Sequence, residues 1–139
     1  MFDVTIITDG SCIPQDERKP GGWAALLDCN GHCKTLQGGQ LHTTSQRMEV
    51  IAVIEAVKAL KAPCSVKLRT DSQYVIGVAT GAFSPKANSD LWDELHYVLT
   101  SGNHHITFEK VAAHTGDPTN ELCDDLAKSA LYDNLVANL

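Results

Sequence analysis

A change in hydrophobic period at Thr43 constrains the fold more than any other feature of the chain. Before that residue, the segments 2–8, 23–27 and 34–41 are short apolar or β-branched runs, which are typical of strands. Asn30-Gly31 stands between the second and third segments and is a strong hairpin signal. Three consecutive strands with such a turn predict an antiparallel meander at the start of the chain.

The segment from Thr43 to Ala62 is expected to be one long helix. It opens with a capping pattern of Thr43 and Gln46, continues with helix formers, and stops before Pro63. Later elements are expected as strands at 66–70 and 106–111, and as helices at 71–79, 90–100 and after Asp117-Pro118. A meander followed by β-α-β units predicts an α/β fold, a mixed sheet with helices on its faces.

Length and composition favour a single domain over residues 1–139, with 43% hydrophobic residues. The chain has no secretory signal pattern and no stretch near the ~20 apolar residues of a membrane span, so we expect a cytoplasmic protein without a membrane partner. The formal net charge of −6 disfavours nonspecific binding to a polyanion. A nucleic-acid partner would therefore require a local source of positive charge, such as a bound divalent metal.

Cysteine usage does not favour a disulfide framework or a zinc site. The chain has five Cys, an odd number, and reduced thiols are expected without an export signal. The segment from Cys29 to Cys33, CNGHC, resembles half a zinc site. No second Cys/His pair stands at zinc-ligand spacing elsewhere, so we do not predict zinc binding.

Four carboxylates occupy positions where a charge is unexpected. Asp9 and Asp71 follow apolar strand segments, and strand ends are where α/β sheets bind ligands. Glu49 and Asp124 lie on the apolar stripes of their predicted helices, whereas Asp125 falls on the wetter side of its helix. Each alone would be a cap, a turn or a rim residue. Together they would take up protons or bind cations, and all-oxygen ligation favours Mg²⁺ or Mn²⁺.

These residues stand within motifs that together resemble ribonuclease H type 1. The motifs are TDGSC, GGWAALL, RMEV, TDSQYV and HTGDPTNELCDD, and the similarity runs from Phe2 to about Ala130. The resemblance implies a five-stranded mixed β-sheet, three antiparallel strands followed by parallel strands, flanked by α-helices. It also implies a metal-dependent endonuclease that hydrolyses the RNA strand of RNA/DNA hybrids. Two Mg²⁺ ions would assist the reaction, with Mn²⁺ as the alternative, and the products would carry 5′-phosphate and 3′-hydroxyl ends.

The resemblance also assigns roles to individual residues. It implies that Asp9, Glu49, Asp71 and Asp124 are catalytic metal ligands, and that His114 assists proton movement or product release. Hybrid recognition, which reads 2′-hydroxyls and groove shape, is implied for Gly10, Ser11, Thr44, Ser45, Gln46, Gln73, Asn88 and Trp92. Gly10 and Ser11 would let the RNA backbone approach. Capping is the competing interpretation for the polar residues, and core packing for Trp92.

The chain departs from that family pattern in three places. TGAFSPKAN, at 80–88, leads directly into the next helix, so the basic protrusion of longer members is missing and the chain resembles a compact form. Asp28 stands where Arg is frequent, near a phosphate pocket. The loop before Gly21 is longer than in compact members, and its Arg18 or Lys19 is a candidate for the missing charge, while Phe83 is a candidate second aromatic contact.

Other functions remain open at this point. A catalytically weak nucleic-acid-binding module would share the fold, because fold does not guarantee chemistry. A DNA nuclease of the same superfamily is the other alternative, which Ser11, Gln46 and Gln73 argue against because DNA has no 2′-hydroxyl. A domain of a larger polyprotein is a third. We expect a free-standing, monomeric protein without an obligate protein partner.

Overall fold

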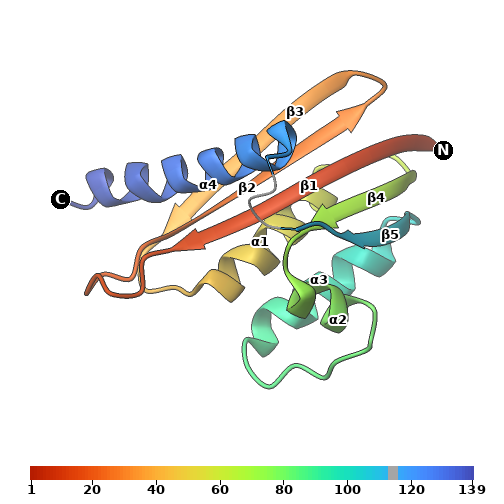
Figure 1. The fold of residues 1–139 in the computed structure, drawn as a ribbon. Helices are drawn as coiled ribbons and strands as arrows, with labels where there is room; N and C mark the ends of the chain where they lie inside the picture. Colours follow the sequence, from red (N-terminus) through yellow and green to blue (C-terminus); the bar gives the residue numbers. More distant parts are fainter. Residues whose placement is uncertain (113–115) are drawn as a thin grey trace.

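The computed structural model describes residues 1–112 and 116–139, and this part of the chain forms five strands and four helices (Figure 1). The strands are β1 (Phe2–Cys12), β2 (Gly21–Cys29), β3 (His32–Gln40), β4 (Cys64–Thr70) and β5 (His105–Lys110). The helices are α1 (Ser45–Lys58), α2 (Gln73–Ala79), α3 (Ser89–Ser101) and α4 (Pro118–Ala137). None of these helices combines the length and the apolar character needed to cross a membrane.

The strands form one mixed sheet in the order β3-β2-β1-β4-β5. β1, β2 and β3 pair antiparallel, whereas β4 pairs parallel with both β1 and β5, which confirms the expected fold class. Asn30 and Gly31 form the β2–β3 turn with φ values of 53° and 84°, the positive values that a two-residue hairpin of this kind requires. The Gly31 N–H donates to Asp28 Oδ1 at 2.9 Å, so Asp28 stabilises this turn.

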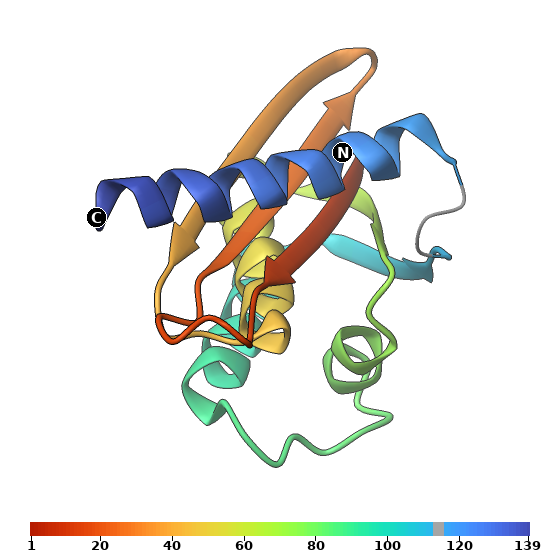
Figure 2. The same ribbon diagram turned by 60° about the vertical axis from the view of Figure 1, so that its left-hand side comes forward.

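Helices cover both faces of the sheet. Figure 2 shows α4 crossing one face over β1, β2 and β3, while α1 lies on the other face. The larger core lies on the α1 side and includes Ile6, Leu68 and Trp92. The smaller core, beneath α4, is centred on Ile7, Ala24, Cys123 and Ala127. Helix α4 packs on the sheet through this smaller core and through Ala130 and Leu131, which are also buried.

Helix α1 differs from its predicted bounds at both ends. Its cap is Thr44 rather than Thr43, and the Thr44 side chain accepts from the Arg47 N–H at 3.2 Å. Thr43 is buried, and its N–H bonds the Lys19 carbonyl at 3.1 Å, so tertiary contacts decide between the two adjacent threonines. The helix ends at Lys58, before the predicted Ala62.

Candidate functional site

Asp9 and Asp71 lie just beyond the point where β1 and β4 stop pairing. The parallel pairing of these strands ends at Ile7 and Arg69, whereas β1 continues to pair with β2 as far as Cys12. Asp9 therefore lies inside a longer strand, and the prediction that it ends its strand is wrong. It is nevertheless beyond the last β4 contact, and Asp71 directly follows β4. Both carboxylates thus lie at the carboxyl edge of the parallel strands, where ligands of α/β sheets bind.

Glu49 reaches the same place from the opposite layer. One carboxylate oxygen from each of Asp9, Glu49 and Asp71 lies within 4.8 Å of the other two. The close approach of α1 to β1 depends on Gly10, since a Cβ at this glycine would lie 2.7 Å from Glu49 N and 2.9 Å from the Met48 carbonyl carbon. The missing side chain at Gly10 therefore makes room for α1, and the expectation that it also makes room for RNA stays a prediction.

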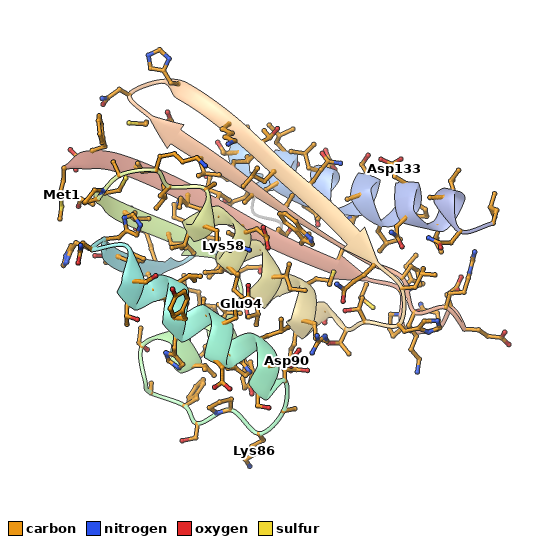
Figure 3. All side chains as sticks on the ribbon, turned by 180° about the vertical axis from the view of Figure 1, so that it is seen from behind. Met1, Lys58, Lys86, Asp90, Glu94 and Asp133 are labelled. Carbon is orange, nitrogen blue, oxygen red and sulfur yellow. The ribbon has the colours of Figure 1, made fainter. Side chains whose placement is uncertain are left out.

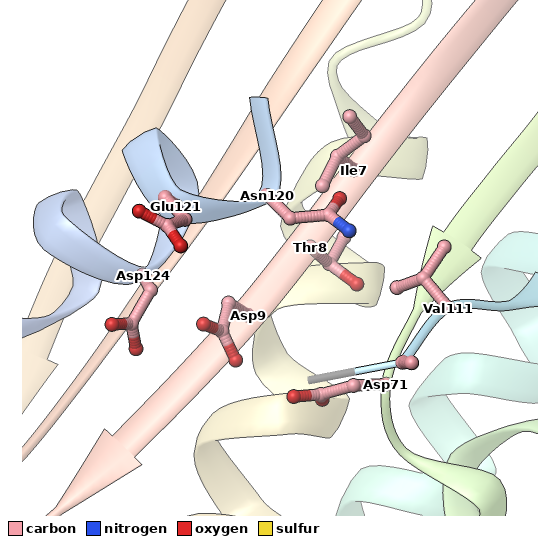
Figure 4. A pocket seen from close by; sticks show the side chains of 9 residues that line it. Ile7, Thr8, Asp9, Asp71, Val111, Asn120, Glu121 and Asp124 are labelled. Carbon is pink, nitrogen blue, oxygen red and sulfur yellow. The ribbon is translucent and has the colours of Figure 1, made fainter. Parts of the chain in front are cut away.

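Asp124 stands beside this cluster rather than within it. Figure 4 shows its carboxylate next to that of Asp9, on the first turns of α4, with Asp71 on the other side of Asp9. Asp124 Oδ2 lies 2.9 Å from Lys128 Nζ, one turn further along the helix. Asp124 is half-buried and Asp125 exposed, as the helical stripe predicts. The structure thus brings three of the four predicted carboxylates into ligand distance, with the fourth adjacent.

Burial and mutual repulsion make this cluster hold protons more tightly than isolated carboxyl groups. Burial, followed by the charge of Asp71, raises the pKa of Asp9 to about 7, and Asp124 adds to the rise. Burial, followed by the charges of Asp9 and Asp71, raises the pKa of Glu49 to about 9. A backbone hydrogen bond from Gly10 opposes both shifts and does not cancel them. Without a cation, the cluster is therefore partly protonated at neutral pH.

The donor set fits a hard divalent cation. Glu49 Oε2 is buried and has no hydrogen-bond partner among the described residues, so this oxygen is available to bind a cation. Three carboxylates offer only oxygen, which suits Mg²⁺ or Mn²⁺ better than zinc. Cys29 and His32 are paired residues at the β2–β3 turn, toward the other end of β2 from the residue that pairs with Asp9. Within residues 1–112 and 116–139, no Cys/His group gathers at ligand distance, so a zinc site finds no support there.

The predicted polar contacts lie around the cluster at the starts of helices. Ser45 and Gln46 begin α1 with exposed side chains, and Gln73 begins α2 exposed, close behind Asp71. Ser11 is half-buried on β1, beyond Asp9. Thr44 is exposed, although its hydroxyl oxygen already caps α1. Exposed hydroxyl and amide groups therefore border the carboxylates on the α1 and α2 sides.

The two predicted contacts on the loop and helix beyond 80 differ from each other. Asn88 has a φ of 62° before α3, and its Oδ1 accepts from Arg47 Nη1 at 3.1 Å. Trp92 is only 1% exposed and meets the Tyr74 ring edge-on, with 5.5 Å between ring centroids. The expectation that Trp92 contacts a substrate is therefore wrong, because its ring fills the core. Phe83 is 43% exposed and stacks on Tyr74, so part of its ring is accessible to a partner.

Other predicted residues are occupied or lie outside the described chain. Arg18 pairs with Asp16, with 3.2 Å between Arg18 Nε and Asp16 Oδ1, and Lys19 is exposed. His114 falls in 113–115, outside the described residues. Sequence reasoning missed Asn120 and Glu121, which line the pocket with Asp9 and Asp124 (Figure 4). Their positions four and three residues before Asp124 place them on its face of the helix, a signal that was present.

Comparison with known proteins agrees with this geometry. The RNase H family model matches residues 2–132. The Ribonuclease H of Nitratidesulfovibrio vulgaris (strain DP4) is 45% identical, covering 93% of this chain and 89% of that protein. The Ribonuclease H of Polaromonas naphthalenivorans (strain CJ2) is 44% identical, covering 92% of this chain and 86% of that protein.

Solved structures share the fold. The RNase H1 of the halophilic archaeon Halobacterium salinarum NRC-1 has a TM-score of 0.72 at 26% identity, covering 94% of this chain and 98% of that one. LC11-RNase H1, solved in complex with an RNA/DNA hybrid, has a TM-score of 0.81 at 18% identity. That similarity covers 95% of this chain and 99% of LC11-RNase H1, and at this identity it shows the fold alone.

Proposed function

The chain belongs to the RNase H family, and we propose that it hydrolyses the RNA strand of RNA/DNA hybrids with the help of divalent cations. The observation that carries the proposal is the group of Asp9, Glu49 and Asp71, whose carboxylate oxygens lie within 4.8 Å of one another at the carboxyl edge of the sheet. Without a cation, a buried cluster of carboxylates like this one destabilises the fold, because its negative charges repel one another.

Asp9, Glu49 and Asp71 would hold the cations, and Asp124 would join them from α4. When bound, Mg²⁺ or Mn²⁺ supplies charge stabilisation at the phosphate and activates a water molecule, and we propose the two-ion form of this chemistry. Water adds to phosphorus and the bond from phosphorus to the 3′ oxygen breaks. The 3′ oxygen takes up a proton, which leaves 5′-phosphate and 3′-hydroxyl ends. His114 is proposed to assist this proton movement or the release of product.

Selectivity for RNA is proposed to come from the polar side chains that border the carboxylates. Ser11, Gln46 and Gln73 offer hydroxyl and amide groups that can bond a 2′-hydroxyl or a base edge, and Ser45 lies beside them. Backbone groups of Gly10 remain available even though its missing side chain serves packing against α1. Thr44 and Asn88 are proposed to face the DNA strand, where a phosphate can accept from the side-chain amide N–H of Asn88 while Asn88 Oδ1 accepts from Arg47.

The test is cleavage of an end-labelled RNA strand annealed to DNA, in Mg²⁺ and in EDTA, by the wild-type protein and by Asp71→Asn. We expect Mg²⁺-dependent cutting that falls at least a hundredfold in the variant, because the cluster loses one charged ligand. Asp125→Asn is the matched control, since Asp125 is exposed and lies outside the cluster. Duplex DNA of the same sequence should remain intact.

Each outcome separates the proposal from its alternatives. Hybrid binding without cutting in Mg²⁺ or Mn²⁺, by folded protein, would favour a nucleic-acid-binding module. Equal cutting of duplex DNA would favour a DNA nuclease. Full activity of Asp71→Asn would remove the carboxylate cluster from the mechanism.

A further inference from the structure

Lys128 bonds Asp124, the predicted metal ligand that lies beside the Asp9–Glu49–Asp71 cluster. Its Nζ lies 2.9 Å from Asp124 Oδ2, the shortest ion pair among the described residues. The lysine side chain is 52% exposed, whereas that of Asp124 is 20% exposed. The ammonium group therefore approaches from the solvent side, while the carboxylate it binds lines the pocket of Asp9 and Asp71.

An i,i+4 pair of this exposure contributes little to stability, so the contact has no evident structural purpose. The position of Lys128 beside the carboxylates does affect cation binding. Asp124 Oδ2, which accepts from the ammonium group, is a weaker donor to a metal ion while that bond is made. Lys128 also adds a positive charge beside the place where a dication would bind. Both effects oppose cation binding at Asp124, and the charge of Lys128 also reaches Asp9.

We propose that Lys128 is a positioning residue that holds the Asp124 carboxylate outside the Asp9–Glu49–Asp71 cluster and competes with a divalent cation for it. The inference rests on the proposed function, because it takes the cluster to be a metal site. A cation that recruits Asp124 through Oδ2 must displace the ammonium group into solvent. The flexible, half-exposed lysine stem permits this movement without a change in the backbone of α4. The cation concentration at which Asp124 joins the site is then set by Lys128.

The variant that tests this is Lys128→Met, which keeps an unbranched side chain and removes the charge. Titration calorimetry with MgCl₂, and separately with MnCl₂, would measure cation affinity of the whole protein without nucleic acid. For each metal, we expect the weaker of the two binding steps to become roughly three- to tenfold tighter in Lys128→Met than in wild type. This is the effect of one nearby unit charge on a dication in screened water. Lys128→Arg keeps the charge and should stay within twofold of wild type.

Lys58→Met is the matched control. Lys58 is 50% exposed and pairs with Glu55 and Glu94 at 3.6 and 3.8 Å, so the substitution also removes one paired surface lysine. Figure 3 shows Lys58 and Glu94 together on the α1–α3 side of the molecule. Its affinity for Mg²⁺ should equal that of wild type, which separates a contact effect at Asp124 from a change in net charge.

Three results would overturn the inference. Equal affinity of wild type and Lys128→Met, or weaker binding by the variant, would show that Lys128 does not compete with the cation. An equal gain in Lys58→Met would reduce the effect to net charge. Wild-type protein that binds neither cation but remains folded would contradict the metal site itself, and with it the proposed function. Hybrid cleavage at lower Mg²⁺ by Lys128→Met would follow as a secondary result.

Discussion

Replacing Glu49 by glutamine is expected to stabilise the metal-free protein at neutral pH. The pKa of Glu49 rises from an ordinary value of 4.5 to about 9 on folding, mainly through burial. Between these values the folded protein holds a proton that the unfolded chain has released. The free energy of unfolding therefore falls as the pH rises through this window. Below about pH 4.5 both states hold the proton, so Glu49 causes no such loss there. Glutamine keeps the shape of the side chain and removes this dependence.

The size of the effect follows from the pKa shift. At pH 7.5 the wild-type protein is about 3 pH units above the unfolded value, which corresponds to at most about 4 kcal/mol at 1.36 kcal/mol per unit. Relaxation of the cluster lowers this figure, and so does any loss of the hydrogen bond from Gly10. We expect Glu49→Gln to gain about 1–3 kcal/mol, or roughly 3–10 °C in Tm for a chain of this size.

Thermal unfolding in EDTA at pH 4.5, 6.0 and 7.5 would measure this gain. The advantage of Glu49→Gln should be absent at pH 4.5 and grow with pH, and added Mg²⁺ should raise the Tm of wild type more than that of the variant. Glu55→Gln is the control, because Glu55 lies on the same helix, pairs with Lys58 and is outside the cluster. A variant that is less stable than wild type at pH 7.5 would refute the idea that the cluster is strained without a cation.

Two substitutions test the packing around the site. Gly10→Ala should lose about 1–3 kcal/mol of unfolding free energy, because the new Cβ would press on the α1 backbone at Glu49, and it should weaken Mg²⁺ binding in the same calorimetric assay. A change in hybrid affinity without either loss would show that Gly10 serves the approach of RNA rather than the packing of α1. Trp92→Ala should lose about 3–5 kcal/mol in denaturant unfolding, as expected for a buried ring. The milder Trp92→Phe should leave the Kd for hybrid unchanged. A tenfold higher Kd in folded protein would indicate that Trp92 contacts the substrate.

Local signals in the sequence predicted the parts of the fold that local chemistry decides. Asn30-Gly31 adopts the positive φ values that the hairpin requires, and Asp117 caps α4 before Pro118 as predicted. The helical stripe also predicted that Asp124 is more buried than Asp125, and the structure confirms this. In each case the deciding interactions lie within a few residues of one another, so the sequence contains them.

Other features depend on contacts between distant segments. The length of β1 beyond Thr8 depends on pairing with β2, so the position of Asp9 within the strand could not be read from its own neighbours. Thr43 and Thr44 are equally good caps, and contact of Thr43 with the Lys19 backbone decides between them. The burial of Trp92 was predictable in part, because Leu95 follows it three residues later on the same helical face.

The site comes from separate parts of the chain, and this links its chemistry to folding. Asp9 comes from the sheet, Glu49 from the helix layer on one face, and Asp124 from the helix on the other face. Their approach requires the contact of α1 with Gly10 and the small core under α4. Because the same approach raises the pKa values of Asp9 and Glu49, the fold without a cation gives up stability at the place where it gathers ligands. A bound cation would offset this loss of stability, so cation affinity and the destabilisation of the metal-free cluster should change together. A substitution that relieves the repulsion should therefore stabilise the metal-free protein and weaken its response to Mg²⁺.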